Sequence, residues 1–119
     1  MPVRSLRSSV LRWPDPTEVD AAVSAWSVEA AASKAGVRRV GYFGSYARGD
    51  WGVGSDVDLL VLVEKSDEPF ERRPLGFDVR RLPVPADVLV YTMAEWDRMS
   101  LSGGLPRAVA AEVVWVFER

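Results

Sequence analysis

The sequence has 119 residues, of which 48% are hydrophobic and 27% charged, with a formal net charge of -2. This length and balance predict one soluble globular domain, and they exclude a disordered chain or two domains of ordinary size. Because the chain contains neither Cys nor His, a thiolate nucleophile, a Ser-His-Asp triad and an ordinary zinc site are excluded. Any metal ion must be held by oxygen atoms, which favours Mg²⁺ or Mn²⁺.

The sequence has no recognisable targeting signal and only a small net charge. No apolar run approaches the ~20 residues of a membrane span. The first residues, Met1-Pro-Val-Arg-Ser-Leu-Arg, lack the apolar core of a secretory signal. We therefore expect a cytoplasmic protein. The negative net charge does not favour general binding to nucleic acid, which is not an expected partner.

The N-terminal third predicts one long helix. Residues 1–13 contain three arginines among apolar residues and fit either one or two turns of amphipathic helix or a basic solvated tail. Trp13-Pro-Asp-Pro-Thr is a turn and cap cluster. After it, apolar residues recur at helical spacing from Glu18 to Lys34. Gly36 is placed to end this helix.

The middle of the chain predicts two strands around a short turn of helix. Val37 to Phe43 has a mixed strand pattern and is stopped by Gly44-Ser45, and Tyr46 to Asp50 fits one helical turn. Asp56 to Val63 is apolar on both faces after its first residues, which predicts a central strand. Glu64 to Pro85 is a charged connection whose length suits a crossover, with a short helix expected over Leu75 to Leu82.

The C-terminal third predicts a strand, two helices and a last strand. Ala86 to Thr92 is the third strand, and Thr92 with Glu95 resembles a capping box for a helix over Met93 to Met99. A loop over Ser100 to Gly104 is then followed by a helix over Pro106 to Glu112 and a peripheral strand over Val113 to Phe117. We expect an α+β fold with helices packed on one mixed sheet, whose edge strand could pair two copies as a homodimer.

Three aspartates form the clearest candidate site. Asp56 and Asp58 flank Val57 at the start of the central strand, so their carboxylates project side by side about 6 to 7 Å apart. Their repulsion is removed by a shared divalent cation. Asp87 opens the next strand, and if the two strands are neighbours, three carboxylates meet at one end of the sheet. Such a cluster could hold two metal ions for phosphoryl or nucleotidyl transfer.

Gly44-Ser45 is a candidate phosphate turn. It lies between a strand and a short helical segment, where backbone N–H groups and a hydroxyl can hold phosphate oxygens. Arg48 is equally suited to a phosphate contact and to an ion pair with Asp50. Trp51 is placed either to stack on a base or to pack against the protein, and packing is the favoured interpretation. The other tryptophans, Trp13, Trp26, Trp96 and Trp115, are expected in the core or an interface.

Gly44-Ser45, ten intervening residues and Asp56-Val57-Asp58 together resemble the signature of the DNA polymerase β-like nucleotidyltransferase superfamily. The run GSYARGDWGVGSDVDLLV is similar to its small MNT-type (minimal nucleotidyltransferase) branch. The resemblance implies two Mg²⁺ ions on Asp56 and Asp58, with Asp87 on the ion that activates the acceptor hydroxyl. It also implies that Gly44 and Ser45 hold the triphosphate of ATP or another NTP.

The resemblance leaves the acceptor open. Relatives in this branch are often antitoxins paired with a HEPN-type RNase, and some attach AMP to a tyrosine of that partner. An enzyme that modifies a partner protein is therefore the first hypothesis. A non-catalytic antitoxin that acts by direct contact is the alternative, which the intact trio of aspartates disfavours. A small-molecule enzyme of the aminoglycoside-modifying type is disfavoured by the length of the chain.

Overall fold

The computed structural model describes residues 13–102 and 105–119. Its elements in chain order are α2 (Pro16–Ser33), β1 (Val37–Phe43), α3 (Ser45–Arg48), β2 (Val57–Val63), the 3-10 helix η1 (Phe70–Gly76), β3 (Ala86–Thr92), α4 (Met93–Ser102), α5 (Leu105–Glu112) and β4 (Val114–Glu118). The expected α+β fold is confirmed. The helix or tail expected over residues 1–13 lies outside the described residues, apart from Trp13.

The strands form one mixed sheet in the order β3-β2-β1-β4. β1 pairs antiparallel with both β2 and β4, whereas β2 pairs parallel with β3. The central place predicted for β2 and the peripheral place predicted for the last strand are thus confirmed. A parallel pair needs a crossover, which the long connection between β2 and β3 supplies.

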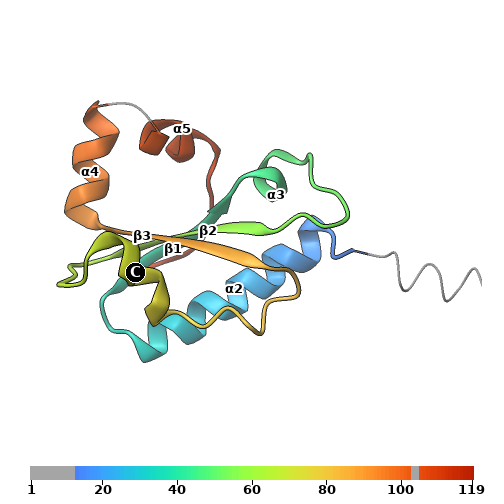
Figure 1. Cartoon of the computed structure of the whole chain (residues 1–119), viewed down its shortest axis with the longest axis horizontal. Helices are drawn as coiled ribbons and strands as arrows, with labels where there is room; N and C mark the ends of the chain where they lie inside the picture. Colours follow the sequence, from blue (N-terminus) through green and yellow to red (C-terminus); the bar gives the residue numbers. More distant parts are fainter. Residues whose placement is uncertain (1–12, 103–104) are drawn as a thin grey trace, which may run out of the picture.

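Helix α2 covers one face of the sheet (Figure 1). Its buried side chains include Val19, Val23 and Trp26, which belong to one core cluster with inward residues of β1 and β2. The helix begins at Pro16, earlier than predicted, because Asp15 and Glu18 form a reciprocal capping box. The role predicted for Gly36 is wrong. The helix ends at Ser33, and Lys34 donates its N–H to the carbonyl of Ala30 in an extended conformation.

Helices α4 and α5 lie on the opposite face (Figure 1). Trp96 of α4 and Val109 of α5 are buried in a second core cluster with Leu60 and Leu62 of β2. The predicted capping box is confirmed, because Thr92 and Glu95 exchange hydrogen bonds of 2.9 and 3.1 Å. α4 extends past the predicted end to Ser102, which removes most of the loop expected there. The helices thus cover both faces of the sheet. Polar side chains can reach solvent at one end, where β2 and β3 begin.

The helix predicted over Leu75 to Leu82 is wrong. The connection instead forms η1 over Phe70–Gly76, and no helix covers residues 77–85. Tertiary contacts explain the position of η1. The Phe70 ring lies 5.1 Å from the Tyr91 ring, and Arg73 donates to the carbonyl of Val90 and to both carboxylate oxygens of Glu95. These contacts hold η1 against β3 and α4.

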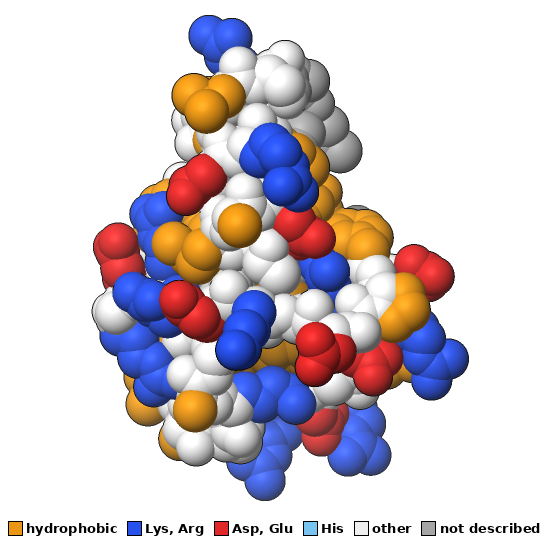
Figure 2. All heavy atoms as spheres, turned by 90° about the vertical axis from the view of Figure 1, so that its left-hand side faces the viewer, with side chains coloured by type: hydrophobic (Ala, Val, Ile, Leu, Met, Phe, Trp, Pro, Cys, Tyr) orange, Lys and Arg blue, Asp and Glu red, His pale blue; other side chains and the backbone are white. Residues whose placement is uncertain are grey.

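The side of the molecule that carries α4 and η1 presents acidic and basic side chains interspersed with separate hydrophobic ones (Figure 2). Several of the charges are paired, as in Arg72 with Glu68 and Arg73 with Glu95. In the part of the chain that the structure describes, this side of the molecule therefore has no large surface patch of a single charge sign. Among the described residues, no helix is both long and apolar enough to cross a lipid bilayer.

Candidate active site

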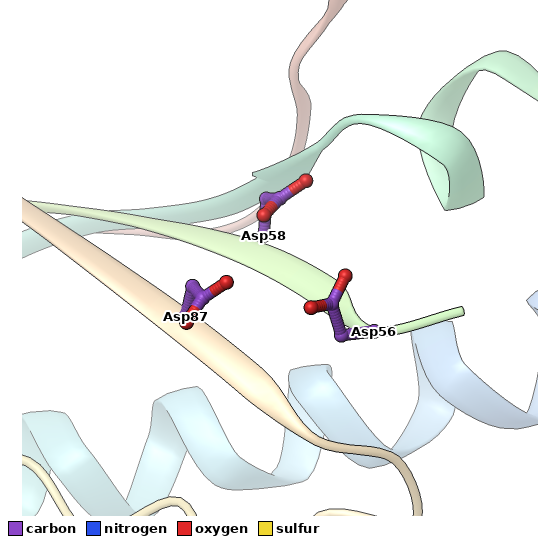
Figure 3. A group of neighbouring side chains, drawn as sticks. All are labelled: Asp56, Asp58 and Asp87. Carbon is purple, nitrogen blue, oxygen red and sulfur yellow. The ribbon is translucent and has the colours of Figure 1, made fainter. Parts of the chain in front are cut away.

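Asp56, Asp58 and Asp87 meet at one end of the sheet, on the face away from α2 (Figure 3). Asp58 of β2 lies directly opposite Asp87 of β3 in the parallel register, and Asp56 immediately precedes β2. Each of the three offers a carboxylate oxygen, and these atoms lie within 4.8 Å of one another. The predicted convergence of the three carboxylates is confirmed.

The local sequence explains why the acids share a face. Val57 points into the α2 side of the core and is fully buried, so its neighbours Asp56 and Asp58 project to the other side. The N–H of Val57 donates to the carbonyl of Pro85 at 2.9 Å, which aligns the starts of β2 and β3. Leu60, further along β2, is fully buried on the same face as Asp58. The acids therefore lie where the apolar interior meets solvent.

The electrostatics of the cluster favour a cation. Burial raises the pKa of Asp58, and the neighbouring carboxylates of Asp56 and Asp87 raise it further. A divalent cation bound between the three groups would remove this repulsion. The donors are all carboxylate oxygens, which suit Mg²⁺ or Mn²⁺. On these observations the residues present fit such an ion.

Gly44 brings the turn after β1 against the aspartates. Its backbone has φ 83° and ψ -153°, a region open essentially to glycine alone. A Cβ at this position would collide with Oδ2 of Asp58 and lie 3.2 Å from its Cγ. The carbonyl of Gly44 accepts the N–H groups of Ala47 and Arg48 at 3.0 and 2.9 Å, which starts α3. Only glycine allows this turn to approach Asp58 so closely.

Glu112, which sequence reasoning missed, contacts this turn. The N–H of Gly44 donates to Oε2 of Glu112 at 2.7 Å, and Nη1 of Arg48 donates to both oxygens of Glu112 at 3.3 Å. Arg48 also forms an ion pair with Asp50 at 3.2 Å, which is one of the two roles considered for it. Glu112 ends α5, 68 positions from Gly44. No local pattern could have indicated this contact, because it depends on how α5 packs.

The tryptophans pack as predicted. Trp51 stacks on Tyr46, with ring centroids 5.7 Å apart, and Trp26 and Trp96 are buried. Trp13 donates its indole N–H to the carbonyl of Ser55 at 3.0 Å, which holds the loop before β2. Trp115 lies 6.2 Å from Trp96, edge to face. These contacts favour packing over stacking on a base for Trp51.

A cavity of about 620 Å³ adjoins the aspartates. Its lining combines the two strand acids with mostly apolar side chains: Phe43, Asp58, Pro74, Ala86, Asp87, Val88 and Leu89. Another cavity, of about 500 Å³, lies at the other end of β1 and β2 beside η1, and none of the three aspartates lines it. The first cavity is therefore the one that can present a substrate to the carboxylates.

The fold and the carboxylate cluster agree with the family to which the chain belongs. Residues 26–112 match the nucleotidyltransferase domain family, so the chain is a member of that family.

Two similar proteins add detail. One is a "Putative protein adenylyltransferase" of Methanocaldococcus jannaschii, which is 40% identical over 52 residues, covering 44% of this chain and 52% of that protein. The chain thus spans about half the length of this relative. The other is the crystal structure of a "putative nucleotidyltransferase" from Sulfolobus solfataricus. It has a TM-score of 0.65 and 23% identity, and the match covers 87% of this chain and 84% of that one. This structural likeness supports the fold.

Proposed function

We propose that this chain transfers a nucleoside monophosphate, AMP from ATP or the equivalent group of another NTP, to a hydroxyl group of a partner protein. The observation that carries the proposal is the cluster of Asp56, Asp58 and Asp87 beside the Gly44 turn, in a chain of the nucleotidyltransferase family. The name of the Methanocaldococcus jannaschii relative supports AMP as the group and a protein as the acceptor.

The proposed reaction is an in-line substitution. The acceptor hydroxyl gives up its proton to solvent and its oxygen attacks the α-phosphorus, the bond from the α-phosphorus to its bridging oxygen breaks, and pyrophosphate leaves. Asp56, Asp58 and Asp87 would hold two Mg²⁺ ions, which when bound supply positive charge for the phosphate oxygens. Gly44, Ser45 and Arg48 would hold the triphosphate. The N–H of Gly44 and the guanidinium of Arg48 are donors that suit phosphate oxygens.

The acceptor would enter through the cavity that Asp58 and Asp87 line. Its apolar lining suits the body of a protein side chain, and its two carboxylates would lie beside the hydroxyl of a side chain bound there. The resemblance to MNT-type domains adds a HEPN-type RNase as the expected partner. In such a pair, modification of the RNase by this chain would neutralise it.

A labelling assay tests the proposal. The protein is incubated with Mg²⁺, ATP labelled in the α-phosphate and the co-expressed product of the adjacent gene. We expect label on that product, and we expect Asp58→Asn to reduce the rate about 100-fold or more because it removes one carboxylate charge from the cluster. Asp67→Asn is the matched control, since Asp67 is exposed in the connection after β2.

The same assay separates the enzyme from a contact antitoxin. Transfer that Asp58→Asn abolishes and Asp67→Asn preserves supports the proposal. Neutralisation of the partner that survives Asp58→Asn, with no label transferred by any variant, contradicts it and favours action by direct contact.

A further inference from the structure

We infer that the carboxylate of Glu112 is a built-in competitor of the triphosphate and that nucleotide binding displaces it. The inference rests on the proposed nucleotide site. Glu112 holds the N–H of Gly44 at 2.7 Å and Nη1 of Arg48 at 3.3 Å. These two groups are the donors proposed for the phosphate oxygens. A carboxylate and a phosphate present similar anionic oxygens, so both suit the same donors.

The two anions cannot occupy the turn together. The Gly44 N–H carries one hydrogen, which already points to an oxygen of Glu112. Arg48 has five N–H donors, of which Nη1 donates to Glu112 and Nε to Asp50, so the single hydrogen of the Gly44 N–H is the donor that Glu112 blocks. A triphosphate placed against an ionised Glu112 would also meet strong like-charge repulsion. Binding at Gly44 therefore requires Glu112 to move first.

The surrounding packing indicates which part of Glu112 moves. On its N-terminal side Val109 is buried against β2 and α4, and on its C-terminal side β4 is paired with β1. The backbone is thus held on both sides of Glu112. Its side chain is 26% exposed and can rotate toward solvent. Displacement is then a change of the Glu112 side-chain conformation, with the sheet unchanged.

The effect of Glu112 on nucleotide affinity depends on the fraction of molecules in which its carboxylate does not occupy the Gly44 turn. If Glu112 occupies the turn in about nine-tenths of the molecules, the apparent dissociation constant of the triphosphate rises about tenfold. Hydrogen bonds between charged groups are strong enough to maintain such a fraction, even with Arg48 half exposed. Glu112 thereby sets how much nucleotide is needed to fill the site.

Titration with tripolyphosphate and Mg²⁺ by calorimetry tests the role of Glu112 without assuming a nucleotide base. We expect Glu112→Ala to bind about tenfold more tightly than the wild type. Glu112→Gln should be intermediate, because its amide oxygen can still accept the Gly44 N–H but carries no charge. Asp50→Asn is the matched control, since it removes an acid that contacts Arg48 but not Gly44. The ¹H–¹⁵N signal of Gly44 should shift in Glu112→Ala and stay in place in Asp50→Asn.

The outcomes are distinct. Tighter binding by Glu112→Ala than by both the wild type and Asp50→Asn supports the inference. Equal or weaker binding by Glu112→Ala overturns it and leaves the proposed function intact. Equal gains in Glu112→Ala and Asp50→Asn also overturn it, because general charge then explains the effect. If no variant binds tripolyphosphate, the nucleotide site itself is contradicted, and the proposed function fails together with the inference.

Discussion

Replacement of Gly44 by alanine tests whether the close approach of the turn to Asp58 has a function. The φ of 83° and ψ of -153° at Gly44 make a non-glycine residue cost about 1 to 3 kcal/mol. The new Cβ would also collide with Oδ2 of Asp58 and lie 3.2 Å from Cγ, so that carboxylate must move. A displacement of about 1 Å at a reacting centre can reduce a rate about 100-fold. We expect that loss in label transfer from ATP with Mg²⁺.

Gly49→Ala is the matched control. Gly49 also has a positive φ, 91°, but a Cβ there would meet no atom within 4 Å from beyond its neighbours in the chain. We expect a loss of about 1 kcal/mol in the free energy of unfolding, measured with urea, and retention of most of the transfer rate. If Gly44→Ala remains folded and transfers label as fast as Gly49→Ala, the reasoning about Asp58 is refuted.

Two further substitutions test the electrostatics. Without metal, Asp58→Asn should unfold at a higher temperature than the wild type, because burial and two like charges raise the pKa of Asp58 and disfavour its ionised form. Added Mg²⁺ should raise the melting temperature of the wild type and leave that of Asp58→Asn unchanged. If Asp58→Asn melts at a lower temperature than the wild type in the absence of metal, this reasoning is contradicted. The second is Glu95→Gln. Arg73 lowers the pKa of Glu95 from 4.5 to about 2, with a contribution from the backbone of Thr92. The ion pair should therefore stabilise the fold above pH 4.5 and lose its contribution as the pH falls toward 2. Glu95→Gln should remove about 2 kcal/mol at neutral pH, with little difference from the wild type in strong acid, as measured by urea unfolding at each pH. A constant difference at all pH values would show that the charge is not responsible.

Much of the site could be predicted because its geometry follows from strand alternation. Asp56 and Asp58 flank Val57, so burial of Val57 places both acids on the other face. Their meeting with Asp87 needed one further condition, that β2 and β3 are neighbours, and the register of Asp58 with Asp87 satisfies it. The roles proposed for these residues remain predictions.

The features that sequence reasoning missed depend on distant contacts. Glu112 reaches Gly44 only because α5 packs on the face that carries the aspartates. The short helix in the connection was misplaced because Arg73 fixes η1 to Val90 and Glu95, which lie later in the chain. Local apolar spacing carries no information about such partners.

ATP labelled in either the α- or the γ-phosphate tests the attack at the α-phosphorus most directly. With Mg²⁺ and the acceptor protein of the co-expression assay, the wild type should transfer label from the α position alone and release an equal amount of pyrophosphate. Asp58→Asn should transfer the α-label at least about 100-fold more slowly and should transfer no γ-label. Transfer of the γ-label, or α-label transfer that persists in Asp58→Asn without a divalent cation, would contradict nucleotidyl transfer at this carboxylate cluster.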